Sequence, residues 1–180
     1  EIIVKKESLD QNSYYEEKNY LYENPYALSY GYMIKSSEKV AEENVFEYQN
    51  KLFQNITGID YEKDILIEIK NKKKNKKLKD AEYIYIIAFE NNNGFKINDV
   101  DYATLEPGQM LAIQNSWNKD EIDITFNSFS GEQSNYLAYY MDEELFESGI
   151  KKLKENELKN VVIDKNIITG EIDVKEPGTL

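Results

Sequence analysis

Carboxylates are the most numerous side chains in this sequence that could take part in catalysis. Acidic residues cluster at three places: Glu42, Glu43 and Glu47; Asp99 and Asp101; Glu143 and Glu144. Glycoside hydrolysis needs two carboxyl groups about 5 to 10 Å apart, and each cluster offers such a pair. However, the chain has 34 acidic residues, so chance pairs that serve helix starts and solubility are expected. We therefore name no catalytic residue and leave open whether the chain is an enzyme.

The absence of two residue types excludes several kinds of catalytic and metal site. The chain has neither cysteine nor histidine, which excludes thiolate sites, imidazole metal sites and histidine-dependent triads. We expect no metal and no cofactor. The net charge is −12, and this argues against nucleic acid as a partner, because nucleic-acid binding needs a basic face.

Four side chains are candidates for binding a ligand, in particular a saccharide: Tyr26, Gln49, Asn50 and Trp117. An exposed indole can stack on a sugar ring, although a single tryptophan more commonly fills a core. The neighbouring amides of Gln49 and Asn50 can bond either to sugar hydroxyls or to nearby backbone groups. Of these two roles for the amides, we favour the backbone.

Positive charge is concentrated in residues 70–79. This stretch contains seven lysines: Lys70, Lys72, Lys73, Lys74, Lys76, Lys77 and Lys79. Like charges at this density repel one another, so one interpretation is a mobile hairpin loop. The other is contact with anionic lipid headgroups or with a phosphate-bearing envelope polymer. The lysines that we assign to this contact are Lys72, Lys73, Lys74, Lys76 and Lys77.

Two stretches have the spacing of amphipathic helices. Over 45–57, Val45, Tyr48, Leu52 and Ile56 recur at helical spacing, flanked by Phe46 and Phe53, and this stripe predicts the buried face. Asn44 suits the N-cap of this helix, and Gly58 suits a left-handed end. A second helix is predicted over 143–154, with Asp142 as its N-cap.

The other elements are predicted to be strands, separated by turn residues. They cover residues 2–5, 14–22, 27–34, 64–70, 83–89, 110–114, 121–129, 136–141, 159–163 and 168–174. Asn93-Gly94 predicts a hairpin turn and Pro107-Gly108 a type II turn. This pattern predicts a mainly β (α+β) fold, an antiparallel, jelly-roll-like β-sandwich with two helices, in which the last two strands complete the sheet.

Three parts of the sequence carry a family likeness. Residues 22–28 read YENPYAL and are followed by Gly31-Tyr32, and residues 44–50 read NVFEYQN and are followed by Gly58. The third part is the tail, LKNVVIDKNIITGEIDVKEPGTL. Together these motifs resemble the YfhO-type bacterial multi-pass membrane proteins. Val45 stands where the family pattern has proline, a departure that removes no chemical group.

The resemblance implies that the chain lies on the extracytoplasmic face of the cell membrane. YfhO-like proteins resemble membrane-embedded glycosyltransferases that use a lipid-phosphate-linked sugar and decorate cell-envelope polymers such as teichoic acids. The implied function is to position the acceptor polymer or the lipid-linked sugar for that enzyme. The implied partners are the transmembrane part of the same protein and a saccharide or envelope polymer. A purely structural domain and a carbohydrate-binding β-sandwich module are the alternatives.

The expected organisation is one extracytoplasmic domain over residues 1–180. Its 180 residues suffice for a core of its own. An alternative division separates an N-terminal subregion over 1–60, which carries the first helix, from a β-sandwich over 61–180. No apolar run approaches the roughly 18 residues that a transmembrane helix needs. Both ends of the sequence look like the boundaries of an excised domain.

Overall fold

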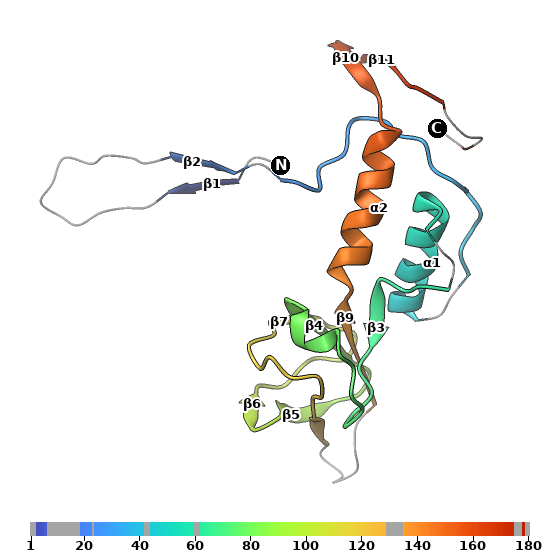
Figure 1. The fold of residues 1–180 in the computed structure, drawn as a ribbon. Helices are drawn as coiled ribbons and strands as arrows, with labels where there is room; N and C mark the ends of the chain where they lie inside the picture. The colour runs from blue at the N-terminus through green and yellow to red at the C-terminus, as the bar shows by residue number, and fades with distance from the viewer. Residues whose placement is uncertain are drawn as a thin grey trace, which may run out of the picture.

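The computed structural model describes residues 3–6, 19–22, 24–41, 44–59, 62–128, 135–174 and 178, the first two stretches by their backbone. The fold is mainly β, with antiparallel sheets and two helices, as predicted (Figure 1). The elements are β1 (Ile3–Lys6), β2 (Asn19–Tyr22), α1 (Val45–Thr57), β3 (Leu66–Glu68), the 3-10 helix η1 (Leu78–Asp80), β4 (Tyr83–Ala88), β5 (Asn92–Ile97), β6 (Val100–Tyr102), β7 (Met110–Gln114), β8 (Ile124–Ser128), β9 (Tyr136–Met141), α2 (Glu143–Glu155), β10 (Lys159–Asp164) and β11 (Ile167–Glu171).

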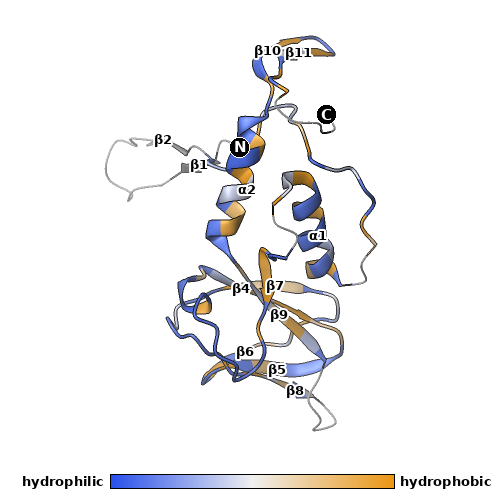
Figure 2. Cartoon of the chain, turned by 45° about the vertical axis from the view of Figure 1, so that its right-hand side comes forward, coloured by the Kyte–Doolittle hydropathy of each residue, from blue (hydrophilic) through white to orange (hydrophobic). Residues whose placement is uncertain are grey.

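Two sheets pack face to face as a small β-sandwich. One is four-stranded, in the order β3-β9-β4-β7, and the other is three-stranded, in the order β6-β5-β8. Figure 2 shows hydrophobic residues along β4, β7 and β9, and buried residues of both sheets form the core between the two sheets. The largest fully buried side chains of this core are Leu78, Ile84, Ile86, Phe95, Ile97, Ile122, Ile124 and Tyr140. Alternating inward-facing residues of both sheets thus form one hydrophobic layer.

The helices α1 and α2 lie side by side at one end of the sandwich (Figure 1). Phe46 of α1 stacks on Tyr139 of β9, with ring centroids 4.2 Å apart, and Phe53 stacks on Phe146 of α2 at 5.7 Å. The predicted ends of α1 are confirmed: Asn44 accepts from the Phe46 N–H at 2.9 Å, and Gly58 is left-handed with φ 61°. Local capping signals therefore fix where these helices begin and end.

The predicted buried face of α1 is confirmed at Phe46 and Phe53 but is wrong at Val45, Tyr48 and Leu52. The residues that α1 buries are Phe46, Asn50, Phe53, Gln54 and Thr57, whereas Val45, Tyr48 and Leu52 are 37% to 40% exposed. The cause is that α1 packs against β3, an edge strand whose peptide groups need hydrogen-bond partners. Polar amides therefore occupy the inner face, and a stripe of apolar side chains remains on the outer face.

Three asparagines bond to backbone as a neighbouring strand would. Asn50 donates from Nδ2 to the Leu66 carbonyl at 2.8 Å and accepts the Leu66 N–H at 2.8 Å. Asn92 pairs in the same way with both backbone groups of Leu105, and Asn71 with both groups of Ile124. Because an amide side chain has the same donor and acceptor as a peptide group, it satisfies strand backbone that no strand covers.

The strand predictions need two corrections in the first half of the chain. Residues 27–34 form no strand, because Tyr32 makes only an isolated bridge to Glu157. The predicted Asn93-Gly94 hairpin turn lies inside β5, and that hairpin instead turns at Asn98-Asp99. Gly94 has φ 83°, and a Cβ there would lie 2.7 Å from the Tyr102 carbonyl oxygen. The glycine thus allows close backbone approach rather than a turn.

The sequence pattern does not predict the strands β5 and β6. Two more predictions, at Pro107-Gly108 and at the C-terminal end, can be compared with the structure. The turn at Pro107-Gly108 is confirmed, since Gly108 has φ 79° and the Gln109 N–H donates to the Glu106 carbonyl at 2.9 Å. β10 and β11 form as predicted, but they pair only with each other and do not complete the sandwich. The predicted residues 2 and 14–18 lie outside the described residues.

Tyr140 makes the stability of the sandwich depend on alkaline pH. Its side chain is fully buried between the sheets, and burial, with the Asp142 charge in the same direction, raises its pKa from 10.0 to about 12. Between these values the unfolded chain loses this proton while the folded chain keeps it. The stability that the protonated Tyr140 contributes to the folded state is therefore complete below pH 10 and is lost as the pH rises through 12.

We expect the free energy of unfolding of Tyr140→Phe to fall less steeply at alkaline pH than that of the parent protein. A two-unit shift corresponds to about 3 kcal/mol, so the variant should lose about 2 to 3 kcal/mol less than the parent between pH 9 and pH 12. Urea unfolding monitored by circular dichroism across this range measures the difference. Parallel curves for the two proteins would contradict the assignment.

Candidate anion-binding site

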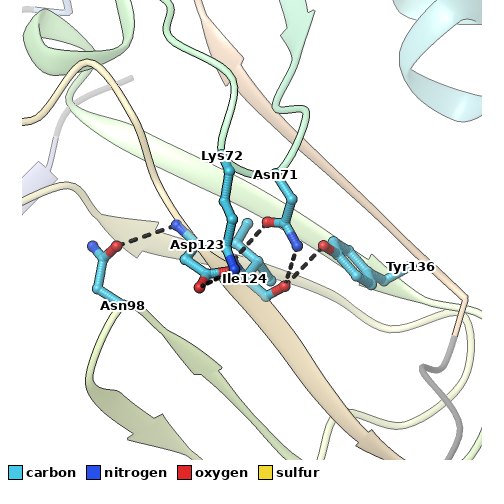
Figure 3. Close-up of polar contacts among 6 residues, drawn as sticks. All are labelled: Asn71, Lys72, Asn98, Asp123, Ile124 and Tyr136. Atoms are coloured by element: carbon cyan, nitrogen blue, oxygen red, sulfur yellow. Dashed lines mark hydrogen bonds and ion pairs between the residues drawn. The ribbon is translucent and has the colours of Figure 1, made fainter.

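Residues 70–79, the lysine segment, cross from β3 to the edge of the other sheet. Asn71 donates from Nδ2 to the Ile124 carbonyl at 2.5 Å, and its Oδ1 accepts the Ile124 N–H at 2.7 Å (Figure 3). The Tyr136 hydroxyl donates to the same carbonyl at 3.1 Å. The first part of the lysine segment is thereby fixed to β8.

Further bonds hold the middle of the lysine segment. The Lys72 N–H donates to the Ile122 carbonyl at 3.3 Å, and the Asn75 N–H donates to the Asp120 carbonyl at 2.6 Å. Leu78, at its end, is buried in the core. The hairpin interpretation is therefore wrong: β3 and β4 both pair with β9, not with each other, and asparagines interspersed among the lysines anchor the backbone.

The lysines divide into paired and unpaired groups. Lys70 lies 3.5 Å from Glu68 and Lys72 lies 3.4 Å from Asp123, while Lys77 pairs with Asp142. Among the described residues, no carboxylate lies within 4 Å of four other exposed amines, those of Lys73, Lys74, Lys76 and Lys79. Lys73, Lys74 and Lys76, three of the five lysines predicted to contact anions, therefore have no carboxylate partner among the described residues. Lys79, which is not in that predicted set, has none either.

Lys77 has a different environment from its neighbours. Its amine bonds to Asp142, the nearly buried N-cap of α2, whose other oxygen accepts the Leu145 N–H at 3.2 Å. The hydrogen bond to Asp142 raises the pKa of Lys77, so the amine stays charged. Because Asp142 neutralises it, Lys77 holds the end of the lysine segment against α2 and adds little attraction for an external anion.

Beside Lys77 lies an acidic groove of about 550 Å³. Its lining residues are Glu62, Lys63, Asp64, Ile67, Lys77, Asp142, Glu144, Leu145 and Ser148. Carboxylates outnumber amines along it, so an anion is repelled from the groove and attracted to the unpaired lysines. The site therefore offers electrostatic attraction on a fixed backbone, with no nucleophile or acid–base pair.

The saccharide candidates do not converge on one site. Trp117 is half-buried and packs against the sandwich core, which is the role that a single tryptophan commonly has. Tyr26 lies against α2, where its hydroxyl donates to Glu147 at 3.0 Å and its ring meets the edge of Phe146 at 5.3 Å. These two aromatic side chains contact different elements, so they do not form a joint stacking surface.

The adjacent amides on α1 lie in different environments. Gln49 is exposed, whereas Asn50 is only 3% exposed and uses both amide atoms on Leu66. The structure therefore places Asn50 in the backbone-bonding role that we favoured. Of the two amides, only Gln49 is accessible to a ligand.

The carboxylate clusters are occupied locally or lie outside the described residues. Glu143 accepts the Glu82 N–H at 2.8 Å, and Asp101 lies 3.1 Å from Lys96. Glu42 and Glu43 fall outside the described residues. Glu144 lines the acidic groove beside Asp142, but Asp142 is paired with Lys77 and caps α2, so it is not a free partner for glycoside chemistry.

Sequence reasoning missed the residues that build this site. Asn71 and Asn75 anchor the lysine segment, and Asp142 neutralises Lys77. Asn71 anchors through both atoms of its side-chain amide, whereas Asn75 anchors through its backbone N–H, which any residue except proline offers. The one signal in the sequence is therefore the amide at Asn71.

Comparisons with known proteins give this site no precedent. No protein-family model, no curated protein and no solved structure matches the chain. None of the helices in the described ranges has the length and apolar character required to cross a bilayer. Likewise, within those ranges no three acidic side chains come together as a metal site would require.

Proposed function

We propose that this chain is the extracytoplasmic domain of a YfhO-like membrane protein and that it positions a phosphate-bearing envelope molecule for a membrane-embedded glycosyltransferase. The lysine segment is the part that binds this molecule. The motifs at residues 22–28 and 44–50 support the family, and the four unpaired lysines support the role. The chemistry that the site recognises is a phosphodiester, carried either by an acceptor polymer or by a lipid-linked sugar.

The observation that carries this proposal is the contrast between local and overall charge. The chain carries −12 overall, which repels polyanions, yet one anchored segment holds four exposed lysines that have no carboxylate partner among the residues that the structure describes. Each lysine near an anionic surface contributes about 1 kcal/mol. Four of them give about 4 kcal/mol, which corresponds to a dissociation constant near 1 mM. Such weak binding suits a domain that must hold and then release a polymer.

We expect the quadruple variant K73Q/K74Q/K76Q/K79Q to bind poly(glycerol phosphate) fragments at least tenfold more weakly than the parent. NMR titration at low salt measures the affinity, and shifts of the backbone amides of residues 70–79 identify the site. A matched control removes the same charge elsewhere on the surface through the exposed residues Lys39, Lys51, Lys119 and Lys151. The control should retain the parent affinity, because only its net charge changes.

The same titration distinguishes the two sources of phosphate. Anionic vesicles that shift residues 70–79 as strongly as the polymer fragments indicate a lipid headgroup, whereas shifts with the fragments alone indicate the acceptor polymer. A parent domain that shows no shift with either would overturn the proposal. Neutral oligosaccharides should leave residues 70–79 unchanged.

The second candidate function is a purely structural domain that supports the transmembrane part. The outer face of α1 favours it, because Val45, Tyr48 and Leu52 form an apolar stripe that a neighbouring element can cover. In the full-length protein, the quadruple lysine variant separates the two functions. A structural role leaves glycosylation of the envelope polymer unchanged, and a positioning role reduces it.

A further inference from the structure

The β10–β11 ribbon, residues 159–171, projects from the C-terminal end of α2 (Figure 1). Its two strands pair with each other and with no other strand of the described chain. Its base is held by bonds from the Leu158 N–H to the Gly31 carbonyl at 2.8 Å and from the Met33 N–H to the Asn156 carbonyl at 2.9 Å. The ribbon is thus firmly attached at its base, while the rest extends away from the protein.

The ribbon exposes aliphatic side chains on both of its faces. Val162, Ile163, Ile167 and Ile168 are 49% to 63% exposed. Ile163 lies opposite Ile168 on one face, and the other face carries Val162 and Ile167, paired with Thr169 and Asp164. An isolated two-stranded ribbon is at best marginally stable in water, and a cluster of exposed aliphatic residues indicates an interaction surface.

The ribbon is poorly suited to pairing with a second strand. The register shifts between Lys159 and Val162, and Asn160 in this bulge has φ 51°. Bulges of this kind twist an edge strand away from intermolecular pairing. Residues 159–171 also contain no aromatic residue, methionine or arginine, which are the types enriched at protein interfaces. A protein partner would in addition cover one face, whereas this ribbon is aliphatic on two.

The two aliphatic faces of the ribbon point to a bilayer, because lipid surrounds an inserted ribbon on all sides. The ribbon lies on the helical side of the sandwich, while the lysine segment runs along the sandwich itself (Figure 1). This inference rests on the proposed function, in which the chain lies at a membrane surface. The ribbon projects away from the sandwich beyond α2, so its exposed side chains can reach lipid without the sandwich in between (Figure 1).

We propose that the β10–β11 ribbon inserts its aliphatic side chains into the boundary between headgroups and acyl chains of the outer leaflet. The exposed Lys159 and Lys165 flank these side chains, and a lysine can lay its stem on apolar surface while its amine reaches a lipid phosphate. Asp164 at the turn keeps the tip within the headgroup layer. The ribbon therefore lies in the interface and does not cross the membrane.

Vesicle flotation tests the proposal, with phosphatidylcholine vesicles so that the lysine segment meets no net charge. We expect the full chain to float with the vesicles, and the variant V162T/I163T/I167T/I168T to float at least tenfold less. Threonine keeps the β-branched shape of these residues and their preference for strands. The control V45Q/Y48Q/L52Q removes exposed apolar residues from α1 instead and should float as the parent does.

A second measurement follows the depth of the ribbon. In a W117F background, I167W should show a blue-shifted emission on adding vesicles, together with quenching by lipids brominated in the acyl chains. Unchanged emission and equal flotation of parent and threonine variant would overturn the proposal. A dimer that the threonine substitutions dissociate, without vesicle binding by the parent, would also overturn it and assign the ribbon to a protein interface.

The two proposals can fail separately. The K73Q/K74Q/K76Q/K79Q variant should float with phosphatidylcholine vesicles as the parent does while losing its affinity for polymer fragments. The threonine variant should keep its affinity for the fragments while losing flotation. If the fragments never bind but the parent floats, the proposed function fails and membrane contact by the ribbon remains.

Discussion

Asn50→Asp should destabilise the protein by about 3 to 5 kcal/mol at neutral pH. The substitution removes the Nδ2 donor to the Leu66 carbonyl and places a carboxylate where the side chain is 3% exposed. An uncompensated buried charge has a cost of this size, and an unsatisfied carbonyl adds to it. Urea unfolding at neutral pH measures the loss. A change below about 1 kcal/mol would show that the Asn50–Leu66 pair does not hold α1 on β3.

The control for this substitution is one residue away. Gln49→Glu converts an amide to a carboxylate on the same helix, but at an exposed position, so we expect a change within about 0.5 kcal/mol. Acid provides a second check. Burial raises the pKa of the carboxyl introduced by Asn50→Asp in the folded state, so the penalty should shrink as the pH falls from this raised pKa toward about 4, below which the group is neutral in both states.

Gly149 should tolerate no side chain, although it lies within a helix. Alanine normally stabilises a helix by about 1 kcal/mol relative to glycine. At this position, however, a Cβ would overlap Cζ of Phe53 and lie 2.7 Å from Cε1 of the same ring and 3.1 Å from Cδ1 of Ile59. We therefore expect Gly149→Ala to destabilise by about 2 kcal/mol and Gly149→Leu by at least about 3 kcal/mol, because the two helices must separate.

A double-mutant cycle tests the cause of this loss. Phe53→Leu shortens the side chain that the new methyl group meets, so adding it to Gly149→Ala should cost at least about 1 kcal/mol less than the sum of the two single changes. Ser148→Ala is the positional control, since Ser148 is exposed on the same helix. Thermal unfolding of the four proteins gives the coupling. Additive losses would mean that the helices do not meet at Gly149.

The parts of the fold that the sequence could predict depend on local signals. Caps at Asn44 and Asp142 and a left-handed glycine at Gly58 set the helix ends, and these agree with the structure. The buried face of α1 could not be predicted in this way. Its orientation depends on Leu66, sixteen residues from Asn50, whose edge peptide group attracts an amide inward. A pattern that treats amides as solvent-facing centres the predicted face on Val45, Tyr48 and Leu52, and it includes only Phe46 and Phe53 from the face that is buried.

The candidate site was predictable in its charge and not in its geometry. A dense lysine run must be exposed, and residues 70–79 are largely so. Its anchoring depends on Asn71 meeting Ile124, 53 residues away, and no local pattern encodes that distance. The β10–β11 ribbon shows the same limit, since its aliphatic composition is typical of a buried sheet. Whether another strand lies beside it is a property of the whole fold.

The asparagine side chains also bear on how this protein behaves at high concentration. Asn50 covers an open peptide group of β3, and Asn71 covers one of β8, and these are edge strands of the two sheets. A growing amyloid fibril recruits a chain through such open backbone groups. Because amide side chains of the protein itself bond to backbone groups of both edge strands, the sandwich has fewer open backbone groups at which a fibril can begin.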